Sequence, residues 1–517
     1  MAHNAQTFKF KDMFEKIYSS TWTIWIIIAA GIYIRVVQYI ANRSLWFDEA
    51  MLSLNIVNRS FHGLLQTLNF HQAAPIGFLF LEKLAVSVFG PNEYSLRLLP
   101  LLSGVIALFV FYKVCKLYIK EKAIPIAVLL FSISYPLIQY SSEVKQYSTD
   151  VCVALILYLI ASPFFSKENG NENYIIFGFV GGLSVWISFP SVFILAGVGS
   201  IIFILYLYSG KSKEIKKLTA TYIFWIINFA IVYYLSFYNI LSQKDLVNAW
   251  KHSFAPSPFV SFSKFKWYFN YFCFGNFYYF FGNRGYMIAA FLFFIGFAKI
   301  FTEKNVKLAA IFSPIIFLLI ASALHKYPGG ARLALFLISG IILIASEGAL
   351  DLISKYSGNI AVLVLSIFIA FFSYPIYDAL KTVVVPIQRE EIKPAMKYIS
   401  ENFKKDDTIY IYYGAVPAFR FYSEKFNIDK NKCIEGSSAG SDDWNIFLKE
   451  IEKLRGKKRV WVLFSHLFKN WRRINEEKFL LFHLNMVGQR SYLRQYKGAS
   501  VWLYDLTEHK MAGLKDP

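Results

Sequence analysis

Long apolar segments recur along almost the whole chain, and this repetition constrains the fold more than any other feature. Eleven of them are long enough, or nearly so, to cross a bilayer, which takes about 20 helical residues. They span residues 22–40, 98–112, 123–140, 151–165, 174–189, 192–208, 218–240, 286–298, 306–324, 331–345 and 360–377. Hydrophobic residues make up 56% of the 517 residues, more than one soluble core could bury. The sequence therefore predicts a polytopic α-helical membrane protein with about 11 transmembrane helices.

The apolar segment 76–89 is treated differently, because it is short and carries Glu82 and Lys83 at its centre. We expect it to be an interfacial helix in the first outer loop. With this assignment the lysine-rich loops at 113–122, 211–217 and 299–307 all face the cytoplasm, as the positive-inside rule requires. Most of the formal net charge of +20 is then explained by topology, and no nucleic-acid partner is expected. The chain is predicted to cross the plasma (inner) membrane many times, with its N-terminus in the cytoplasm.

The last part of the chain has more charge and shorter apolar runs. Residues 408–413 and 459–464 have the pattern of strands, and residues 391–402 and 417–425 have the pattern of helices. Residues 490–496 and 499–504 have the pattern of a β-hairpin. We therefore expect a membrane domain at 1–380 and a small soluble α/β domain at 387–517. After an odd number of spans this domain is extracytoplasmic, and it contains no nucleotide-binding motif.

Two adjacent carboxylates, Asp48 and Glu49, come soon after the first apolar segment, in the sequence SLWFDEA at 44–50. A carboxylate at a membrane face loses contacts with water, and a cation, a metal or a substrate can replace those contacts. Such a position therefore favours a functional role. Acidic residues also favour the first turn of a helix, and the apolar-rich residues 50–57 fit a helix. The two interpretations are compatible, and this segment by itself favours neither.

A second acidic constellation follows the third span, in the sequence YSSEVKQYSTD at 140–150. Here Glu143 can face the same outer pocket as Asp48. In an extended loop Glu143, Lys145 and Tyr147 share one side, whereas in a helix Lys145 would point away. A loop suits a site better. The alternative is a surface ion pair between Glu143 and Lys145, which contributes little to stability.

Two further outer loops each allow a structural and a functional interpretation. The aromatic run 262–281 in the long loop 241–285 fits an aromatic belt in the membrane interface, which is sufficient to explain it. It would also fit a flap over a lipid-linked substrate. The sequence HKYPGGAR at 325–332 places Lys326 and Arg332 on either side of two glycines that allow close backbone approach to a ligand. A tight turn with interfacial basic residues explains the same sequence.

Four motifs follow one another along the first 150 residues: WFDE at 46–49, HQAAPIG at 71–77, FGxxExxxRxxP at 89–100 and SEVKxY at 142–147. This order resembles the membrane-embedded C-type glycosyltransferases. The similarity is greatest to the protein O-mannosyltransferase superfamily and to the bacterial aminoarabinose and related transferases, which use polyprenyl-phosphate sugars. It covers residues 1–377 in architecture. Where many relatives have arginine after the second acid, this chain has Lys145, which offers phosphate a point charge rather than a bidentate fork.

The resemblance implies a role for each motif residue. The donor, a sugar on a polyprenyl phosphate, needs a base for the acceptor hydroxyl and cations for the departing phosphate. Asp48 is the candidate base, with Glu49 and Glu143 as further catalytic carboxylates. The candidate ligands of the donor phosphate are Arg97, Lys83, Lys145, Lys326 and Arg332, and those of the substrate are His71 and Tyr147. For Arg97 and Lys83 the alternative is a long basic side chain that reaches the interface without a ligand.

With one base and a phosphate leaving group, a single displacement that inverts the anomeric configuration suffices. No cofactor is required. Relatives differ in metal dependence, so a divalent ion held by Asp48 and Glu143 stays open. The expected partners are the lipid bilayer, the polyprenyl-phosphate sugar and an extracytoplasmic glycan, lipid or protein acceptor. The alternative functions are a flippase or transporter of lipid-linked saccharides and a non-catalytic partner in envelope assembly.

Overall fold

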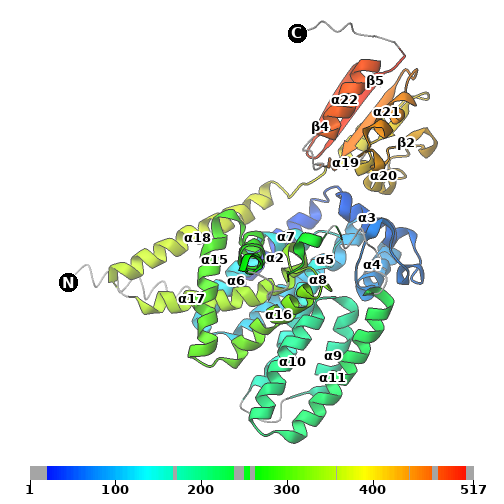
Figure 1. Ribbon diagram of the computed structural model, residues 1–517. Helices are drawn as coiled ribbons and strands as arrows, with labels where there is room; N and C mark the ends of the chain where they lie inside the picture. The colour runs from blue at the N-terminus through cyan, green and yellow to red at the C-terminus, as the bar shows by residue number, and fades with distance from the viewer. Residues whose placement is uncertain are drawn as a thin grey trace. The chain divides into compact units, whose positions relative to one another are not determined.

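The computed structural model describes residues 20–166, 172–237, 248, 250–256, 262–356, 358–441, 443–468 and 475–507. The chain divides into two compact units. The first contains Met1–Ala41 and Arg59–Pro386, and the second combines Asn42–Asn58 with Ile387–Pro517. The first unit is built of helices, and the second contains a five-stranded sheet (Figure 1). The segment that carries Asp48 and Glu49 therefore belongs to the same unit as the C-terminal residues.

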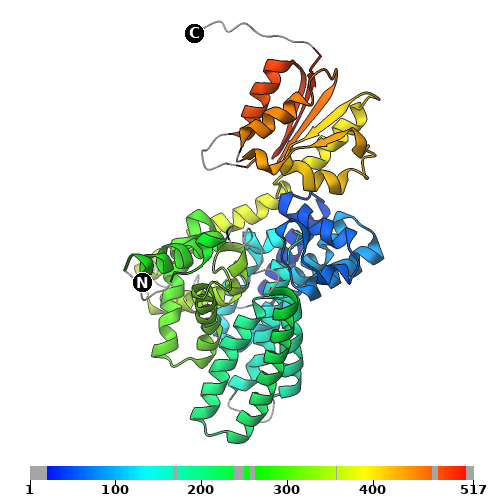
Figure 2. The same cartoon turned by 45° about the vertical axis from the view of Figure 1, so that its right-hand side comes forward.

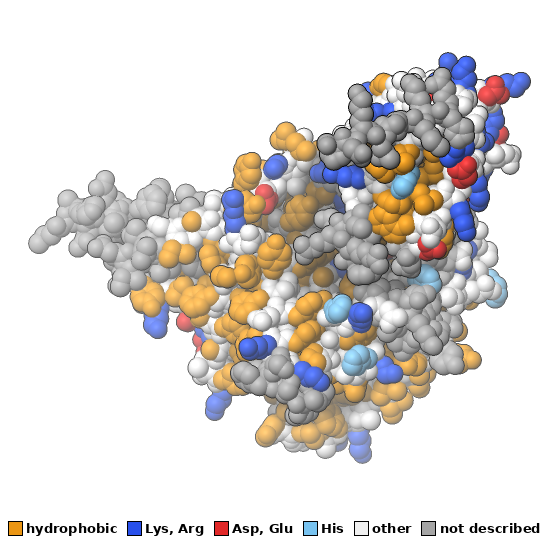
Figure 3. All heavy atoms as spheres, turned by 45° about the horizontal axis from the view of Figure 1, so that its top comes forward, with side chains coloured by type: hydrophobic (Ala, Val, Ile, Leu, Met, Phe, Trp, Pro, Cys, Tyr) orange, Lys and Arg blue, Asp and Glu red, His pale blue; other side chains and the backbone are white. Residues whose placement is uncertain are grey.

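The first unit is a succession of helices with short connections, many of them apolar along their whole length. Their bounds are α2 Thr21–Ile40, α4 Ile76–Phe89, α5 Glu93–Tyr118, α6 Ile124–Ile133, α7 Tyr135–Tyr140, α8 Tyr147–Ala161, α9 Tyr174–Ile187, α10 Ser191–Tyr208, α11 Ser212–Val232, α14 Phe262–Trp267, α15 Asn276–Thr302, α16 Val306–Ala323, α17 Ile338–Lys355 and α18 Gly358–Val384. In the view of Figure 3, hydrophobic side chains cover much of the surface of these helices. Such a surface fits a lipid environment.

Eight helical segments among the described residues are long and apolar enough to cross a membrane. They are Thr21–Ile40, Glu93–Tyr118, Tyr147–Phe165, Ser191–Tyr208, Ser212–Ser236, Tyr268–Thr302, Val306–Ala323 and Ala331–Lys355. Each corresponds to one of the eleven segments expected from the sequence. The other three expected crossings, at 123–140, 174–189 and 360–377, are not among them, so the number of eleven stays a prediction. The segment 76–89 forms the short helix α4, with the bounds that the sequence predicts.

The expected crossing at 123–140 is interrupted, because α6 ends at Ile133 and α7 begins at Tyr135. Pro136 lies in the first turn of α7, where the missing N–H of proline is tolerated, whereas inside a continuous helix it would remove a hydrogen bond. The buried Arg35 of α2 donates to the carbonyl oxygens of Ser132 (3.0 Å) and Phe131 (3.4 Å). A side chain from another helix thus satisfies carbonyls at the end of α6.

The core of the first unit lies around α17, which is buried over most of its length. Helix α15 crosses it very closely, because a Cβ atom on Gly296 would collide with the Ile344 carbonyl and one on Gly348 with the Leu292 carbonyl. Small residues at a helix crossing are typical of packing in membranes. Helices α9, α10 and α11 pack side by side at the lower edge of the view in Figure 1.

The second unit is a mixed sheet with helices on both faces (Figure 2). Its strands are β1 Thr408–Ile411, β2 Cys433–Glu435, β3 Val460–Ser465, β4 Gln489–Tyr496 and β5 Ala499–Asp505, in the order β2-β1-β3-β5-β4. β1 pairs in parallel with β2 and β3, whereas β5 pairs antiparallel with β3 and with β4 in the predicted hairpin. The helices are α3 Phe47–Asn58, α19 Ile392–Asn402, α20 Val416–Tyr422, α21 Trp444–Glu452 and α22 Glu476–Val487.

Candidate functional site

The second acidic constellation lies in the short turn that joins α7 to α8. Glu143 in this turn is completely buried, and the amide nitrogen of Gln139 donates to one of its carboxylate oxygens at 2.9 Å. The turn is tight, since the Lys145 N–H donates to the Glu143 carbonyl at 2.7 Å. Glu143 and Lys145 lie outside the helices, as the sequence favours, but the turn is tight rather than extended, and Tyr147 is already the first residue of α8. Both side chains are buried, whereas the alternative interpretation placed them in an ion pair at the surface.

Lys145 is buried as well, and its ammonium donates to the side-chain oxygen of Gln72 at 2.8 Å. Gln72 follows Phe70 and His71, which both have positive φ angles, 62° and 51°. Two consecutive non-glycine residues in this conformation cost about 1 to 3 kcal/mol each and persist only where other contacts enforce them. The predicted His71 is exposed, so the buried contact from the HQAAPIG motif comes from its neighbour Gln72 instead.

Arg332 lies beside the start of α8. Its guanidinium carbon lies 5.8 Å from the ring centroid of Tyr147 and 5.3 Å from that of Trp250. Both distances allow cation–π attraction. The turn at 325–332 therefore brings one of its two predicted cations to the constellation of Glu143 and Tyr147. The other, Lys326, is exposed.

Next to this group, the hydroxyls of Tyr140 and Tyr279 are 2.6 Å apart. Tyr140 also lies within electrostatic range of Glu143, Tyr147 and Arg332. The sequence did not single out Tyr140, Tyr279 or Trp250 as site residues. Tyr140 is adjacent to the SEVKxY motif, but nothing in the sequence links that motif to Tyr279 or Trp250.

Arg97 is almost completely buried in the first turns of α5, and Glu93 lies one helical turn before it on the same face. The carbonyl of Pro100, one turn further along, accepts a hydrogen bond from Ser148 at 2.9 Å. This bond joins the start of α5 to the start of α8, next to Tyr147. Lys83 is half-buried on α4. On the same helix Glu82 is fully buried, and its burial raises the pKa of its carboxyl well above the usual range.

Asp48 and Glu49 occupy the first turn of α3, in the second unit. Glu49 is completely buried, and one of its carboxylate oxygens lies 3.4 Å from the N–H of Trp46, which fits the reciprocal half of a capping box. The helix-cap interpretation is thus confirmed for Glu49. Asp48 is half-buried. Of the two adjacent carboxylates, Asp48 is the one with access to solvent.

Asp48 and Glu143, the two residues proposed from sequence to share a metal ion, belong to different units. In the described part of the chain, no group of three or more His, Cys, Asp and Glu side chains is arranged to hold a metal ion.

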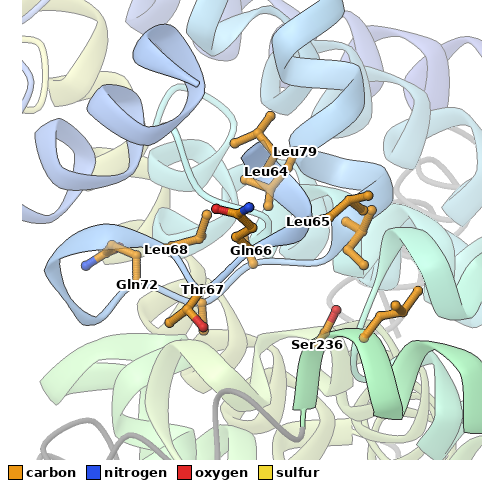
Figure 4. Close-up of a pocket in the computed structure, with 12 residues that line it drawn as sticks. Leu64, Leu65, Gln66, Thr67, Leu68, Gln72, Leu79 and Ser236 are labelled. Atoms are coloured by element: carbon orange, nitrogen blue, oxygen red, sulfur yellow. The ribbon is translucent and has the colours of Figure 1, made fainter. Parts of the chain in front are cut away.

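A pocket opens beside Gln72. It lies between the first-loop residues 64–79 and the last residues of the helix that continues α11, as Figure 4 shows. Its lining is mostly leucine and alanine, with four polar side chains among them, Gln66, Thr67, Gln72 and Ser236. The space inside it is about 30 Å³, which is enough for a small polar group or one or two water molecules.

Residues 73–237 match the sequence model of the family described as dolichyl-phosphate-mannose-protein mannosyltransferase. No curated protein sequence matches the chain significantly. Among solved structures, ArnT from Cupriavidus metallidurans in the apo state is similar over 94% of this chain and 99% of its own, with 11% identity and a TM-score of 0.54. The same protein bound to undecaprenyl phosphate matches over 94% and 98%, with 10% identity and a TM-score of 0.53.

The archaeal oligosaccharyltransferase AglB from Archaeoglobus fulgidus, in complex with an inhibitory peptide and a dolichol-phosphate, is also similar. The match covers 95% of this chain and 74% of the AglB chain, with 13% identity and a TM-score of 0.52. At these identities the structural matches establish the fold. Together with the family match over 73–237, they confirm the resemblance predicted from the four motifs.

Proposed function

We propose that this chain, an integral membrane protein with the fold of the membrane-embedded C-type glycosyltransferases, is itself a glycosyltransferase. It would move a sugar from a polyprenyl-phosphate donor to an extracytoplasmic acceptor with inversion at the anomeric carbon. The observation that carries the proposal is the buried turn with Glu143 and Lys145, held by Gln139 and Gln72. Burying an acid and a cation is costly even when both are hydrogen-bonded, and a role in a site is one reason for a chain to retain them.

The cations of the first unit fit a phosphate leaving group. Lys145 supplies a point charge, and the planar guanidinium of Arg332 can bind two phosphate oxygens at once. Its cation–π contacts with Tyr147 and Trp250 favour a position of that guanidinium next to the two rings. Arg97, Lys83 and Lys326 are assigned as further phosphate-binding candidates. Charge that develops on the departing phosphate is stabilised when such groups are already in place.

Asp48 is assigned as the general base, because it is the half-buried carboxylate of the motif pair. Glu49 is buried and interacts with the start of its own helix, and Glu143 is buried and accepts from Gln139, so both fit orientation better than proton transfer. One base and a phosphate that leaves without protonation are enough for a single displacement. The acceptor then attacks the face opposite the phosphate. We assign His71 and Tyr147 to substrate binding.

The apolar residues beside Gln72 support a contact with the first part of the donor lipid, next to its phosphate. They include Leu64, Leu68 and Leu79, and Gln72 links them to Lys145. An apolar surface next to a buried cation matches the chemistry of a polyprenyl phosphate, an apolar chain that ends in an anion.

The Asp48→Asn variant tests the assignment of the base. Sugar transfer from polyprenyl-phosphate donors should fall by about 10²- to 10⁴-fold in membranes that contain this variant, the usual contribution of general base catalysis. Asp406→Asn is the matched control, because it removes one carboxylate from an exposed position of the same unit. Radiolabelled sugar incorporation, normalised to protein amount, gives the rate. Unchanged transfer by Asp48→Asn would remove Asp48 from the mechanism.

A further inference from the structure

The strand order of the sheet in the second unit reverses once, and in open α/β sheets the crevice outside such a reversal usually binds ligands. The chain leaves β1 through α20 to reach β2 on one side of β1, and then returns through α21 to β3 on the other side. The strand order therefore reverses between the carboxyl ends of β1 and β3. In open α/β sheets this point commonly holds a ligand. The residues that follow the two strands are Tyr412–Gly414 and His466–Phe468.

A segment of the same chain occupies this place. The Phe47 ring stacks on the His466 ring, with the centroids 4.2 Å apart and the planes at 6°, and it meets the Phe468 ring edge-on at 5.4 Å. Two residues earlier, the Leu45 N–H donates to the hydroxyl of Tyr422, the last residue of α20, at 2.9 Å. The WFDE motif thus begins in the crevice where a doubly wound sheet would hold a ligand.

The backbone around the crevice is held in an unusual conformation. His466 has a positive φ angle of 48°, which non-glycine residues adopt only where the surrounding structure enforces it. The loop after β1 approaches it so closely that a Cβ atom on Gly414 would collide with the His466 carbonyl. Strain of this kind occurs most often at functional positions.

Glu390 connects the crevice to the motif. One of its carboxylate oxygens accepts from the Phe47 N–H at 2.8 Å, and the other lies 2.6 Å from Nδ1 of His466. The Phe47 N–H is one of the first N–H groups of α3, which have no acceptor within the helix. A negative charge at this end of a helix is also favourable. The next residue along the helix is Asp48.

We propose that the sheet of the second unit is a docking frame, a rigid support that holds the WFDE motif in place. Glu390 and His466 are then positioning residues for Asp48. The sheet holds the start of α3 in its crevice in place of a nucleotide or other small ligand. Glu390 then fixes the backbone of α3 one residue before the base, and His466 fixes both Glu390 and the Phe47 ring. This inference rests on the proposed function, since it assigns the task of orientation to residues that act through Asp48.

Glu390→Ala, His466→Ala and the double variant test the docking frame in reconstituted full-length protein. A base that is displaced by about 1 Å loses up to about 100-fold in rate, so kcat should fall by about 10- to 100-fold in each single variant. The KM for the lipid-linked donor should stay within about threefold of the wild type, because the basic side chains assigned to the donor phosphate are unchanged. Glu390→Gln keeps an oxygen for the Phe47 N–H and should retain more activity than Glu390→Ala. Since both residues act on one segment, the double variant should be little slower than the slower single variant.

Two further measurements separate positioning from loss of folding. Asp407→Asn is the control, because Asp407 binds Arg459 and Trp461 at the amino end of β1, away from the crevice. This variant should lower thermal stability and keep the wild-type kcat. Ser44→Cys, in a protein whose four native cysteines are replaced by alanine, reports docking without activity, because the Ser44 side chain is buried against Glu391. It should resist maleimide in that protein and react at least several-fold faster when Glu390→Ala is added.

The outcomes distinguish the two proposals. If Asp48→Asn is inactive while Glu390→Ala and His466→Ala keep the wild-type kcat, the docking frame is wrong and the proposed function stands. If Asp48→Asn is fully active, the assignment of the base is wrong. Equal losses of kcat in Asp407→Asn and Glu390→Ala, or fast labelling at position 44 without the Glu390 change, would also overturn the docking frame.

Discussion

Glu82 is fully buried in α4, and neither of its carboxylate oxygens has a hydrogen-bond partner in the described part of the structure. Burial raises the pKa of this carboxyl, which favours the neutral form in the folded protein. The unfolded carboxyl titrates near about 4.3. The folded protein therefore binds a proton at Glu82 more tightly than the unfolded chain does. The stability that this difference supplies is fully present below that pH and is lost as the pH rises toward the higher pKa of the folded state.

Glu82→Gln should for this reason be more stable than the wild type at pH 8, by about 1 to 3 kcal/mol, and similar to it near pH 4. Thermal unfolding in detergent at the two pH values measures the difference. Glu121→Gln removes an exposed carboxylate instead and should behave like the wild type at both. A wild type that gains stability over Glu82→Gln with rising pH would contradict this reasoning.

At the residue scale, the sequence pointed to buried ionisable residues better than to the residues that contact them. Glu143 and Lys145 were selected because they follow a span and belong to the SEVKxY motif, and the structure places both in one buried turn. Gln72 was missed because a neutral amide next to a histidine carries no distinctive signal. Glu390 was missed for a similar reason: an acid in a charged linker is ordinary until the fold places it against Phe47.

At the element scale, local pattern predicted most boundaries. α4 and the hairpin of β4 and β5 follow from apolar length and from the turn at Lys497 and Gly498. The interruption of 123–140 was not predicted, although Pro136 was visible, because it also depends on Arg35 from a distant helix. The aromatic run 262–281 is helical and continues into α15, with a break at Gly282 where φ is 71°. Its composition alone did not distinguish a loop element from an extension of the span.

At the scale of the whole molecule, the composition of the second unit restricts the topology. Asn42–Asn58 and Ile387–Pro517 form one compact unit, so both must lie on the same side of the membrane. The chain therefore crosses an even number of times between them. Seven of the eight candidate spans found among the described residues lie in that interval, so if all seven cross and 76–89 is interfacial, an odd number of the three remaining segments is expected to cross too. All eleven spans of the sequence prediction satisfy this condition. No local pattern could have predicted the pairing of segments more than 300 residues apart.

Cysteine labelling in cells checks the resulting orientation. In a variant whose four native cysteines are replaced by alanine, a single cysteine near Asp429 should react with an impermeant maleimide from outside. One near Lys213 should react only after permeabilisation, because the lysine-rich loop is expected in the cytoplasm. The reverse pattern would place the WFDE motif and the C-terminal unit in the cytoplasm and would exclude an extracytoplasmic acceptor.

Measuring sugar transfer and release of the polyprenyl phosphate in the same reaction tests the transferase activity most directly. Purified protein in liposomes would receive a polyprenyl-phosphate sugar labelled in the sugar, with envelope extracts as the source of acceptor. We expect polyprenyl monophosphate to be released in step with sugar transfer, and the product anomer, determined by NMR, to be inverted relative to the donor. Movement of intact donor between leaflets without release of lipid phosphate would contradict the proposed function and favour a flippase of lipid-linked saccharides.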